Sequence, residues 1–135
     1  MKPKYMLDTN ICIYLMKHQP PEVRARFDAC FVGDVVISAI TLAELEFGIA
    51  SSGDPATNQA ALGSLLEDIR VAPFEAQAAR AYGPQRGANR ERNKNALDKL
   101  IASHALALNI VLVTNNEADF LNYPDLAVEN WVNSH

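Results

Sequence analysis

Short apolar runs alternate along the chain with longer segments in which apolar residues recur at helical spacing. The runs are expected to be strands, and they lie at 4–7, 35–38, 71–72, 110–113 and 126–128. The longer segments predict helices over 9–17, 22–31, 41–50, 58–68, 75–86 and 97–108, with a short turn or helix over 116–121. Residues 87–95 are polar and basic, which predicts an exposed loop or a frayed helix end.

The predicted strands have no polar face. Strands that are apolar on both sides and alternate with helices are typical of a parallel sheet covered on both faces, which places the chain in the α/β class. The length of 135 residues and the 49% of hydrophobic residues suit one domain spanning 1–135. In such sheets the functional site lies beyond the carboxyl ends of the strands, where the strand order reverses.

The formal net charge of -4 argues against a chain that binds polyanions through its overall charge. Any contact with a nucleic acid must therefore come from a local cluster of cations. One such cluster precedes the last long helix and comprises Arg86, Arg90, Arg92 and Lys94, with Lys99 shortly after it. These side chains either form a solvated surface or position the phosphate groups of a nucleic acid.

Cysteine usage and the N-terminal sequence both fit a cytoplasmic protein. Cys12 and Cys30 are too few and too far apart for a disulfide framework, and each stands among apolar residues. We therefore expect buried, reduced thiols. The residues before Asp8 lack the apolar segment of a signal peptide, and no apolar run approaches the length of a membrane span, so we expect no membrane contact.

Two candidate acidic positions follow predicted strands. Asp8 ends the first strand and precedes a helix, so it can cap that helix, hold a metal ion, or do both. Asp119 lies in the turn after 110–113, where Glu117 and Asn116 are alternatives to it. A solvated turn residue is the simpler interpretation of each acid in that turn alone. Because the carboxyl ends of parallel strands share one edge, Asp8 and this turn are expected to lie together.

Two further acids lie in predicted helices. Glu44 follows Thr41 at the spacing of a capping box, in which the glutamate reaches back to the N–H of the capping residue. Asp98 lies in the first turn of the last long helix, where the helix dipole favours an acid. The apolar stripe of that helix is expected to contain Leu97 and Ile101, with Asp98 at its edge.

The candidate acids suggest a specific chemistry if they lie close together. Ionised carboxylates in one site repel one another, so some take up protons unless a cation lies among them. Oxygen ligands alone favour Mg²⁺ or Mn²⁺ over zinc. Such an ion polarises a phosphate group and activates a bound water molecule, so the matching reaction is phosphodiester hydrolysis.

Other chemistry is poorly supported. The chain has no glycine-rich phosphate loop, no dinucleotide-binding fingerprint and no serine in a nucleophile elbow. His104 lies near the apolar stripe of its helix, and we expect it to be packed and hydrogen-bonded rather than a catalytic base. Two rival functions stay open. One is an aspartyl phosphotransferase with Asp8 as nucleophile, although Asn10 stands where that pattern has a second aspartate. The other is a non-catalytic binding module.

Four segments, in this order, resemble the motifs of the VapC-type PIN-domain ribonuclease toxins of type II toxin–antitoxin systems. They are MLDTN at 6–10, IS at 37–38 with ELEFG at 44–48, LDKLIASHA at 97–105 and LVTNNEADF at 112–120. The segment VENW at 128–131 is similar to the usual ending of the family. The family often has Gly and Pro just before the third motif, whereas this chain has NKNA at 93–96, which bears on the local shape of the loop.

The resemblance implies an α/β/α PIN fold around a mostly parallel sheet. It also implies an endoribonuclease that requires Mg²⁺, for which Mn²⁺ can substitute. By motif match, Asp8 and Asp98 are the metal-binding acids, and Glu44 and Asp119 complete the catalytic set. Glu44 would orient or deprotonate the attacking water, and Asp119 would support the ion.

The same resemblance implies the molecular partners. These are an RNA substrate, with transfer RNA loops among the candidates, and a cognate VapB-type antitoxin that inhibits the enzyme. A homodimer is expected, and operator DNA would be contacted only through the antitoxin. The basic residues listed above would then hold the RNA strand next to Asp98.

Overall fold

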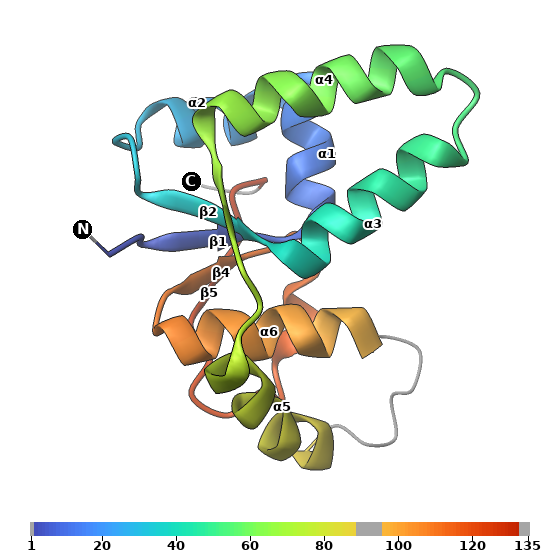
Figure 1. The fold of residues 1–135 in the computed structure, drawn as a ribbon. Coiled ribbons are helices and arrows are strands. Elements are labelled where there is room, and N and C mark those ends of the chain that lie inside the picture. Colours follow the sequence, from blue (N-terminus) through green and yellow to red (C-terminus); the bar gives the residue numbers. More distant parts are fainter. Residues whose placement is uncertain (1, 89–95, 133–135) are drawn as a thin grey trace.

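The computed structural model describes residues 2–88 and 96–132, with the backbone alone for 86–88 (Figure 1). Its helices and strands follow one another in the order β1 (Tyr5–Leu7), α1 (Thr9–Lys17), α2 (Pro21–Asp28), β2 (Val35–Ser38), α3 (Ala39–Ala50), α4 (Pro55–Asp68), β3 (Arg70–Ala72), α5 (Ala76–Ala88), α6 (Ala96–Leu108), β4 (Val111–Val113), the 3-10 helix η2 (Glu117–Phe120) and β5 (Val128–Glu129). Each predicted strand and helix is present, with ends that differ by a few residues.

The strands form one sheet in which every neighbouring pair is parallel. Their order is β3-β2-β1-β4-β5, which confirms the predicted α/β class and the parallel sheet. In this register Met6 of β1 lies between Val36 of β2 and Leu112 of β4. The chain builds β2 and β3 on one side of β1 and then returns to build β4 and β5 on the other. The strand order therefore reverses between β1 and β4, where a functional site is expected.

Side chains of the strands alternate between two hydrophobic cores. Leu7 and Ile37 are buried with residues of α1, α3 and α4, whereas Met6 and Val36 are buried with Ile101 and its neighbours on α6. Figure 1 shows α1 to α4 on one side of the sheet and α5 and α6 on the other. Because both faces are covered, the strands need apolar residues at successive positions, which explains the pattern in the sequence.

Helix α6 buries a different stripe from the predicted one. Ile101 is buried as expected, but Leu97 is 45% exposed and Lys99 is fully buried. The residues of α6 that pack on the sheet include the small Ala102 and Ala105. A helix face built partly of alanines is not revealed by the positions of large apolar residues in the sequence. The expectation that Lys99 belongs to a solvated or phosphate-binding surface is therefore wrong.

Local turn chemistry sets the ends of α2 and α4. The predicted helix over 22–31 stops at 28, because a turn follows in which Gly33 has a φ of 91°. The Asp34 carboxylate accepts the backbone N–H of Phe31 at 2.9 Å and so closes that turn. Helix α4 begins before the predicted position 58, because Asp54 caps it by accepting the N–H of Thr57 at 3.2 Å.

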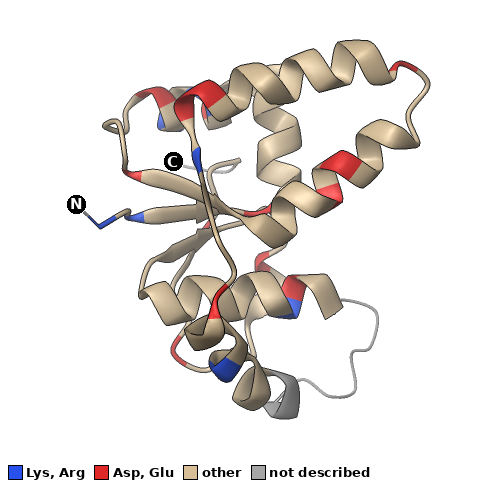
Figure 2. Cartoon of the chain, viewed as in Figure 1, with Lys and Arg blue, Asp and Glu red and all other residues tan. Residues whose placement is uncertain are grey.

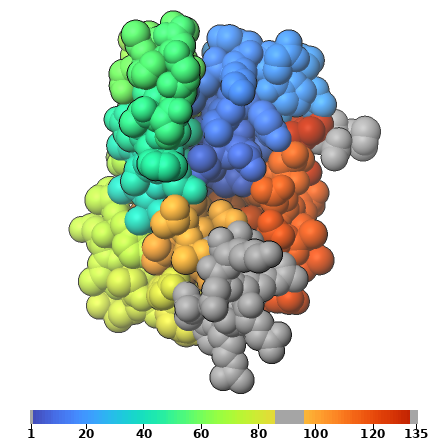
Figure 3. Space-filling model, turned by 90° about the vertical axis from the view of Figure 1, so that its right-hand side faces the viewer, coloured from blue at the N-terminus to red at the C-terminus, as the bar shows by residue number. Residues whose placement is uncertain are grey.

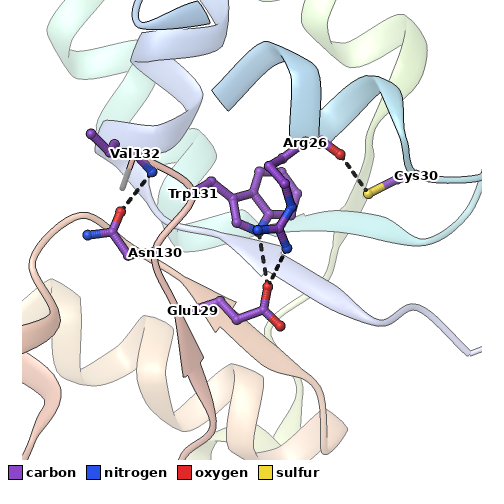
Figure 4. A network of polar contacts seen from close by, with 6 residues as sticks. All are labelled: Arg26, Cys30, Glu129, Asn130, Trp131 and Val132. Atoms are coloured by element: carbon purple, nitrogen blue, oxygen red, sulfur yellow. Dashed lines mark hydrogen bonds and ion pairs between the residues drawn. The ribbon is translucent and has the colours of Figure 1, made fainter. Parts of the chain in front are cut away.

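The C-terminal segment is fastened to α2 and β1 (Figure 4). The indole N–H of Trp131, which is fully buried, donates to Glu129 Oε1 at 3.2 Å. The same carboxylate oxygen lies 2.8 Å from Arg26 Nη2, and the Arg26 guanidinium lies 5.3 Å above the Trp131 ring. Tyr5 packs edge-on against this indole at 5.4 Å. These contacts fix the chain just after β5, at the edge of the sheet where the site is expected.

Both cysteines are free. Cys12 is buried as expected, whereas Cys30 is only half-buried and its thiol lies 3.4 Å from the carbonyl oxygen of Arg26. Within residues 2–88 and 96–132, no helix is long and apolar enough to cross a bilayer.

Candidate active site

Four different elements carry the predicted acids to the carboxyl edge of the sheet. Asp8 directly follows β1, Glu44 lies in α3 after β2, Asp98 lies in the first turn of α6, and Asp119 lies in η2 after β4. Figure 2 shows acidic segments of α3, of α6 and beyond the strand ends on this side of the sheet. Figure 3 looks onto the same edge, where α1, α3 and α6 meet.

Asp8 is buried, with 5% of its surface exposed. Its carboxylate accepts the N–H of Ile11 at 3.0 Å, which confirms that it caps α1. The carboxylate also accepts a hydrogen bond from the hydroxyl of Thr114, which follows β4. Burial raises the pKa of Asp8 and the nearby charge of Glu44 adds to the effect, while these hydrogen bonds oppose it. The fold therefore holds a carboxylate at a position where its negative charge is poorly solvated.

Glu44 does not take part in a capping box, so that prediction is wrong. Helix α3 begins at 39 and is capped by Ser38, whose Oγ accepts the N–H of Ile40 at 3.0 Å. Thr41 therefore lies inside the first turn instead of at its start. Glu44 Oε1 accepts a hydrogen bond from the hydroxyl of Thr9 at 2.7 Å. Because Thr9 follows Asp8 directly, this bond ties Glu44 to the segment that carries the first acid.

His104 is packed and hydrogen-bonded, as predicted. It is 1% exposed, and its Nδ1 lies 2.8 Å from Ser38 Oγ. The Pro73 carbonyl is a second partner, and the Phe74 ring packs edge-on at 5.2 Å. Burial lowers the pKa of His104, which favours the neutral ring. The Ser38–His104 contact joins α3, which carries Glu44, to α6, which carries Asp98.

The charges of all three other predicted acids affect the pKa of Asp98. Burial makes the largest contribution to raising its pKa from 3.8 to about 6, and the charges of Glu44, Asp8 and Asp119 follow in that order. A carboxyl group whose pKa is raised by several like charges gains from the approach of a cation. The four acids that the sequence singled out therefore act electrostatically on one location.

The residues after β4 differ in what they contact. Asp119 adds its charge to the site of Asp98, whereas Glu117 accepts a hydrogen bond from Asn130 Nδ2 at 3.0 Å. The exposed Asn116 donates its backbone N–H to Thr114 Oγ1 at 3.0 Å. Among the three alternatives considered for the fourth position, the electrostatic link to Asp98 favours Asp119.

The donor chemistry of the site suits Mg²⁺ or Mn²⁺. Within the described part of the chain, no group of three acidic, histidine or cysteine side chains is arranged to hold a metal by itself. Mg²⁺ does not need such a cage, because it commonly takes one or two protein carboxylates and completes its octahedron with water and phosphate oxygens. Asp8 and Asp98 offer oxygen donors alone. Burial first, and then neighbouring negative charges, raise the pKa of each, so a cation between the two carboxylates would be stabilised.

The predicted RNA-binding cations cannot be placed around this site. Arg86 lies in the last turns of α5, where only the backbone is described, and Arg90, Arg92 and Lys94 lie outside the described residues. Their role stays a prediction.

The sequence analysis missed two hydroxyl groups of the site. Thr9 holds Glu44 and Thr114 holds Asp8, and both threonines lie just beyond the carboxyl end of a strand: Thr9 follows Asp8 after β1, and Thr114 follows β4. A threonine just after a predicted strand is a signal that can be read from the sequence. Its partner could not, because Thr9 and Glu44 are 35 positions apart.

Comparisons with known proteins agree with this geometry. The family model of the PIN domain matches residues 5–126. Over 130 residues the chain is 38% identical to the tRNA(fMet)-specific endonuclease VapC of Shigella flexneri, covering 95% of this chain and 98% of the relative. The chain belongs to the PIN-domain family, among its VapC-type ribonucleases. The Ribonuclease VapC2 of Rickettsia felis is a similar VapC-type relative, at 38% identity over 133 residues, covering 94% of this chain and 97% of that relative.

Solved structures of VapC-type proteins have the same fold. One is VapBC of Salmonella typhimurium bound to DNA, with a TM-score of 0.87 and 35% identity over 96% of this chain and 98% of that one. Another is VapBC2 of Rickettsia felis bound to a DNA fragment from its promoter, with a TM-score of 0.84 and 36% identity over 94% of this chain and 98% of that one. The α/β arrangement of this chain is thus that of the VapC-type PIN domain.

Proposed function

We propose that this VapC-type chain is a Mg²⁺-dependent endoribonuclease toxin, with its active site at the carboxyl edge of the sheet. The observation that carries the proposal is the raised pKa of Asp98, which burial first and then the charges of Glu44, Asp8 and Asp119 bring to about 6. Four acids from distant parts of the chain share one site, and their mutual repulsion costs the metal-free fold stability. Such a costly arrangement is typical of a functional site.

Asp8 and Asp98 would hold the metal ion, and Asp119 would support it, either directly or through water. A bound Mg²⁺ supplies charge neutralisation at the scissile phosphate and lowers the pKa of the attacking water. Mn²⁺ has the same preference for oxygen ligands and can substitute.

Glu44 would orient the attacking water and accept its proton. The Thr9 hydroxyl holds one Glu44 oxygen at 2.7 Å, so the carboxylate is restrained while its other oxygen can meet the water.

The proposed substrate is a flexible RNA segment. A single-stranded loop can bend its backbone into a small acidic site, whereas a regular duplex cannot. The Shigella flexneri relative is named for its action on tRNA(fMet), which supports a tRNA loop as the first substrate to test. Because the protein has a net charge of -4, the RNA must be held by local cations, and we propose Arg86, Arg90, Arg92 and Lys94 for this role.

The proposed partner is a VapB-type antitoxin. The support is that similar chains from Rickettsia felis and Salmonella typhimurium are known as VapBC complexes bound to DNA. By analogy, operator DNA would be contacted through the antitoxin, and the toxin would form a homodimer.

The proposal is tested by incubating the purified chain with tRNA and with an unstructured RNA, in Mg²⁺, in Mn²⁺ and in EDTA. We expect cleavage with either ion and none in EDTA. Asp8→Asn and Asp98→Asn should each reduce cleavage by about 10³-fold or more. The matched control is Glu67→Gln, which removes an exposed acid on α4 away from the site and should cleave as the wild type does.

Two outcomes would favour the rival functions. A trapped phosphoryl group on Asp8 would support an aspartyl phosphotransferase. A protein that binds its antitoxin yet cleaves no RNA in Mn²⁺ would support a non-catalytic binding module. Cleavage in EDTA at the wild-type rate would contradict the metal-dependent mechanism.

A further inference from the structure

A chain of side-chain hydrogen bonds crosses the carboxyl edge of the sheet beside the four acids. Asn115 Nδ2 donates to Tyr14 Oη of α1 at 3.2 Å, and Asn130 Nδ2 donates to Asn115 Oδ1 at 3.3 Å. The same Asn130 nitrogen donates to Glu117 Oε1 at 3.0 Å, and Asn130 Oδ1 accepts the N–H of Val132 at 2.9 Å. We refer to Tyr14, Asn115, Asn130 and Glu117 as the amide network.

The amide network joins three parts of the fold that are distant in sequence. Tyr14 and Asn115 are 101 positions apart, and Asn115 and Asn130 are 15 apart. Its outer end is rigid, because the chain after β5 is fastened by Trp131 and Glu129 (Figure 4). Its inner end is helix α1, which Asp8 caps. The segment between β4 and η2 is thus held from two sides.

That segment carries two groups that act on the proposed active site. Thr114 directly precedes Asn115 and donates its hydroxyl to Asp8. Asp119 lies two residues after Glu117, and its charge acts on Asp98. The four hydrogen bonds described above do not involve Asp8, Glu44, Asp98 or Asp119 themselves. The network therefore contacts the chain at Asn115 and Glu117, between Thr114 and Asp119.

We propose that Tyr14, Asn115 and Asn130 are positioning residues that fix the segment 114–119, so that Thr114 and Asp119 hold the geometry required for cleavage. The proposal rests on the proposed nuclease function. Its physical basis is that a displacement of about 1 Å at a reacting centre can cost up to about 100-fold in rate, while the hydrogen bonds that prevent it contribute little to global stability. Three neutral side chains are well suited to this role, because they add no charge to a site that is already crowded with acids.

The sharpest test is Tyr14→Phe, which removes one oxygen atom and with it the acceptor for Asn115. Tyr5→Phe is a matched control, because Tyr5 begins β1 and, in the described structure, its hydroxyl makes no hydrogen bond while its ring packs on Trp131. Cleavage of a labelled RNA with Mn²⁺ is measured for both variants. The melting temperature is measured without RNA as a function of Mn²⁺ concentration, which gives the Mn²⁺ midpoint of thermal stabilisation.

For Tyr14→Phe we expect kcat to fall about 5- to 20-fold, with KM changed less than about twofold and melting lowered by only a few degrees. The Mn²⁺ midpoint, read from thermal stabilisation without RNA, should rise about threefold because Asp119 is less well placed. Tyr5→Phe should leave all of these values at the wild-type level. In an Asp119→Asn background, the effect of Tyr14→Phe on kcat should shrink to less than about twofold, as expected for coupled residues.

The positioning role is overturned if Tyr14→Phe retains wild-type kcat, or if its loss of activity disappears at a temperature where the variant is fully folded. An undiminished effect in the Asp119→Asn background would overturn it as well. These outcomes differ from failure of the nuclease function itself, in which the wild-type protein would cleave no RNA with Mg²⁺ or Mn²⁺.

Discussion

Replacing Asp98 by asparagine should make the metal-free protein more stable at neutral pH, although Asp98 is proposed to be essential for cleavage. Burial and the charges of Glu44, Asp8 and Asp119 raise the pKa of Asp98 from 3.8 to about 6. The folded state therefore binds a proton at Asp98 more tightly than the unfolded chain does. Above pH 6 the ionised carboxylate destabilises the fold, and an uncharged asparagine avoids this cost.

The magnitude follows from the same values. A difference between pKa values of 3.8 and about 6 corresponds to at most about 3 kcal/mol at pH 8. Solvent reaches part of the Asp98 side chain and screens its interaction with the neighbouring charges. We therefore expect about half of this destabilisation energy. The asparagine also loses the favourable interaction of an acid with the dipole of α6, about 0.5 kcal/mol. The expected net gain is about 1 kcal/mol, or about 3–5 °C in Tm for a domain of this size.

The sign of the pH dependence is specific to a raised carboxyl pKa. Below pH 3.8 Asp98 is protonated in both states and does not affect stability; it destabilises the fold increasingly between pH 3.8 and about 6, and fully above that. The stability advantage of Asp98→Asn should therefore be complete at pH 8 and shrink as the pH is lowered from about 6 to about 4.5. A carboxylate that forms a stabilising ion pair would give the opposite trend.

The assay is thermal or urea unfolding in EDTA at pH 8 and at about pH 4.5, for the wild type, Asp98→Asn and Glu67→Gln. The control variant removes one negative charge at an exposed position, so it separates the effect of net charge from that of the cluster. An Asp98→Asn variant that is no more stable than the wild type at pH 8 would refute the reasoning. An equal gain at both pH values would refute it too.

Three further predictions concern the contacts around the site. Thr9→Val removes the hydroxyl that holds Glu44 and should lower kcat about tenfold in the RNA cleavage assay, whereas Thr9→Ser should retain most of the activity. Because burial lowers the pKa of His104, its contribution to stability is complete above pH ~6.5 and is lost as the pH falls. Urea unfolding between pH 7.5 and 5 should show this loss in the wild type and a weaker one in His104→Gln. Arg26→Gln breaks a half-exposed ion pair and an interaction with the Trp131 ring, and should lower the free energy of unfolding by about 1 kcal/mol. A loss of several kcal/mol in urea unfolding would show that the C-terminal contact is more important than its exposure suggests.

The strands and the position of the site could be predicted because they depend on simple patterns. Apolar runs on both sides of a strand indicate a covered parallel sheet, and the acid that ends such a run must lie at its carboxyl edge. Asp8 illustrates this: the structure confirms that it caps α1, and its charge acts on Asp98.

The contacts that span long sequence distances could not be predicted in the same way. Thr41 and Glu44 have the spacing of a capping box, but Ser38 lies at the end of β2 and begins the helix first. Which hydroxyl then meets Glu44 depends on how α1 and α3 pack, and no local pattern contains that information. The burial of Lys99 could not be predicted either. The small residues Ala102 and Ala105 place a different face of α6 against the sheet from the one that the large apolar residues indicate.

The central claim is that Asp8 and Asp98 bind the same divalent ion at the carboxyl edge of the sheet. Anomalous diffraction from a crystal soaked in Mn²⁺ tests it most directly. We predict one peak in direct contact with carboxylate oxygens of both residues, which is lost in crystals of Asp98→Asn. A Mn²⁺ ion bound elsewhere, with Asp8 and Asp98 not sharing an ion, would contradict the account.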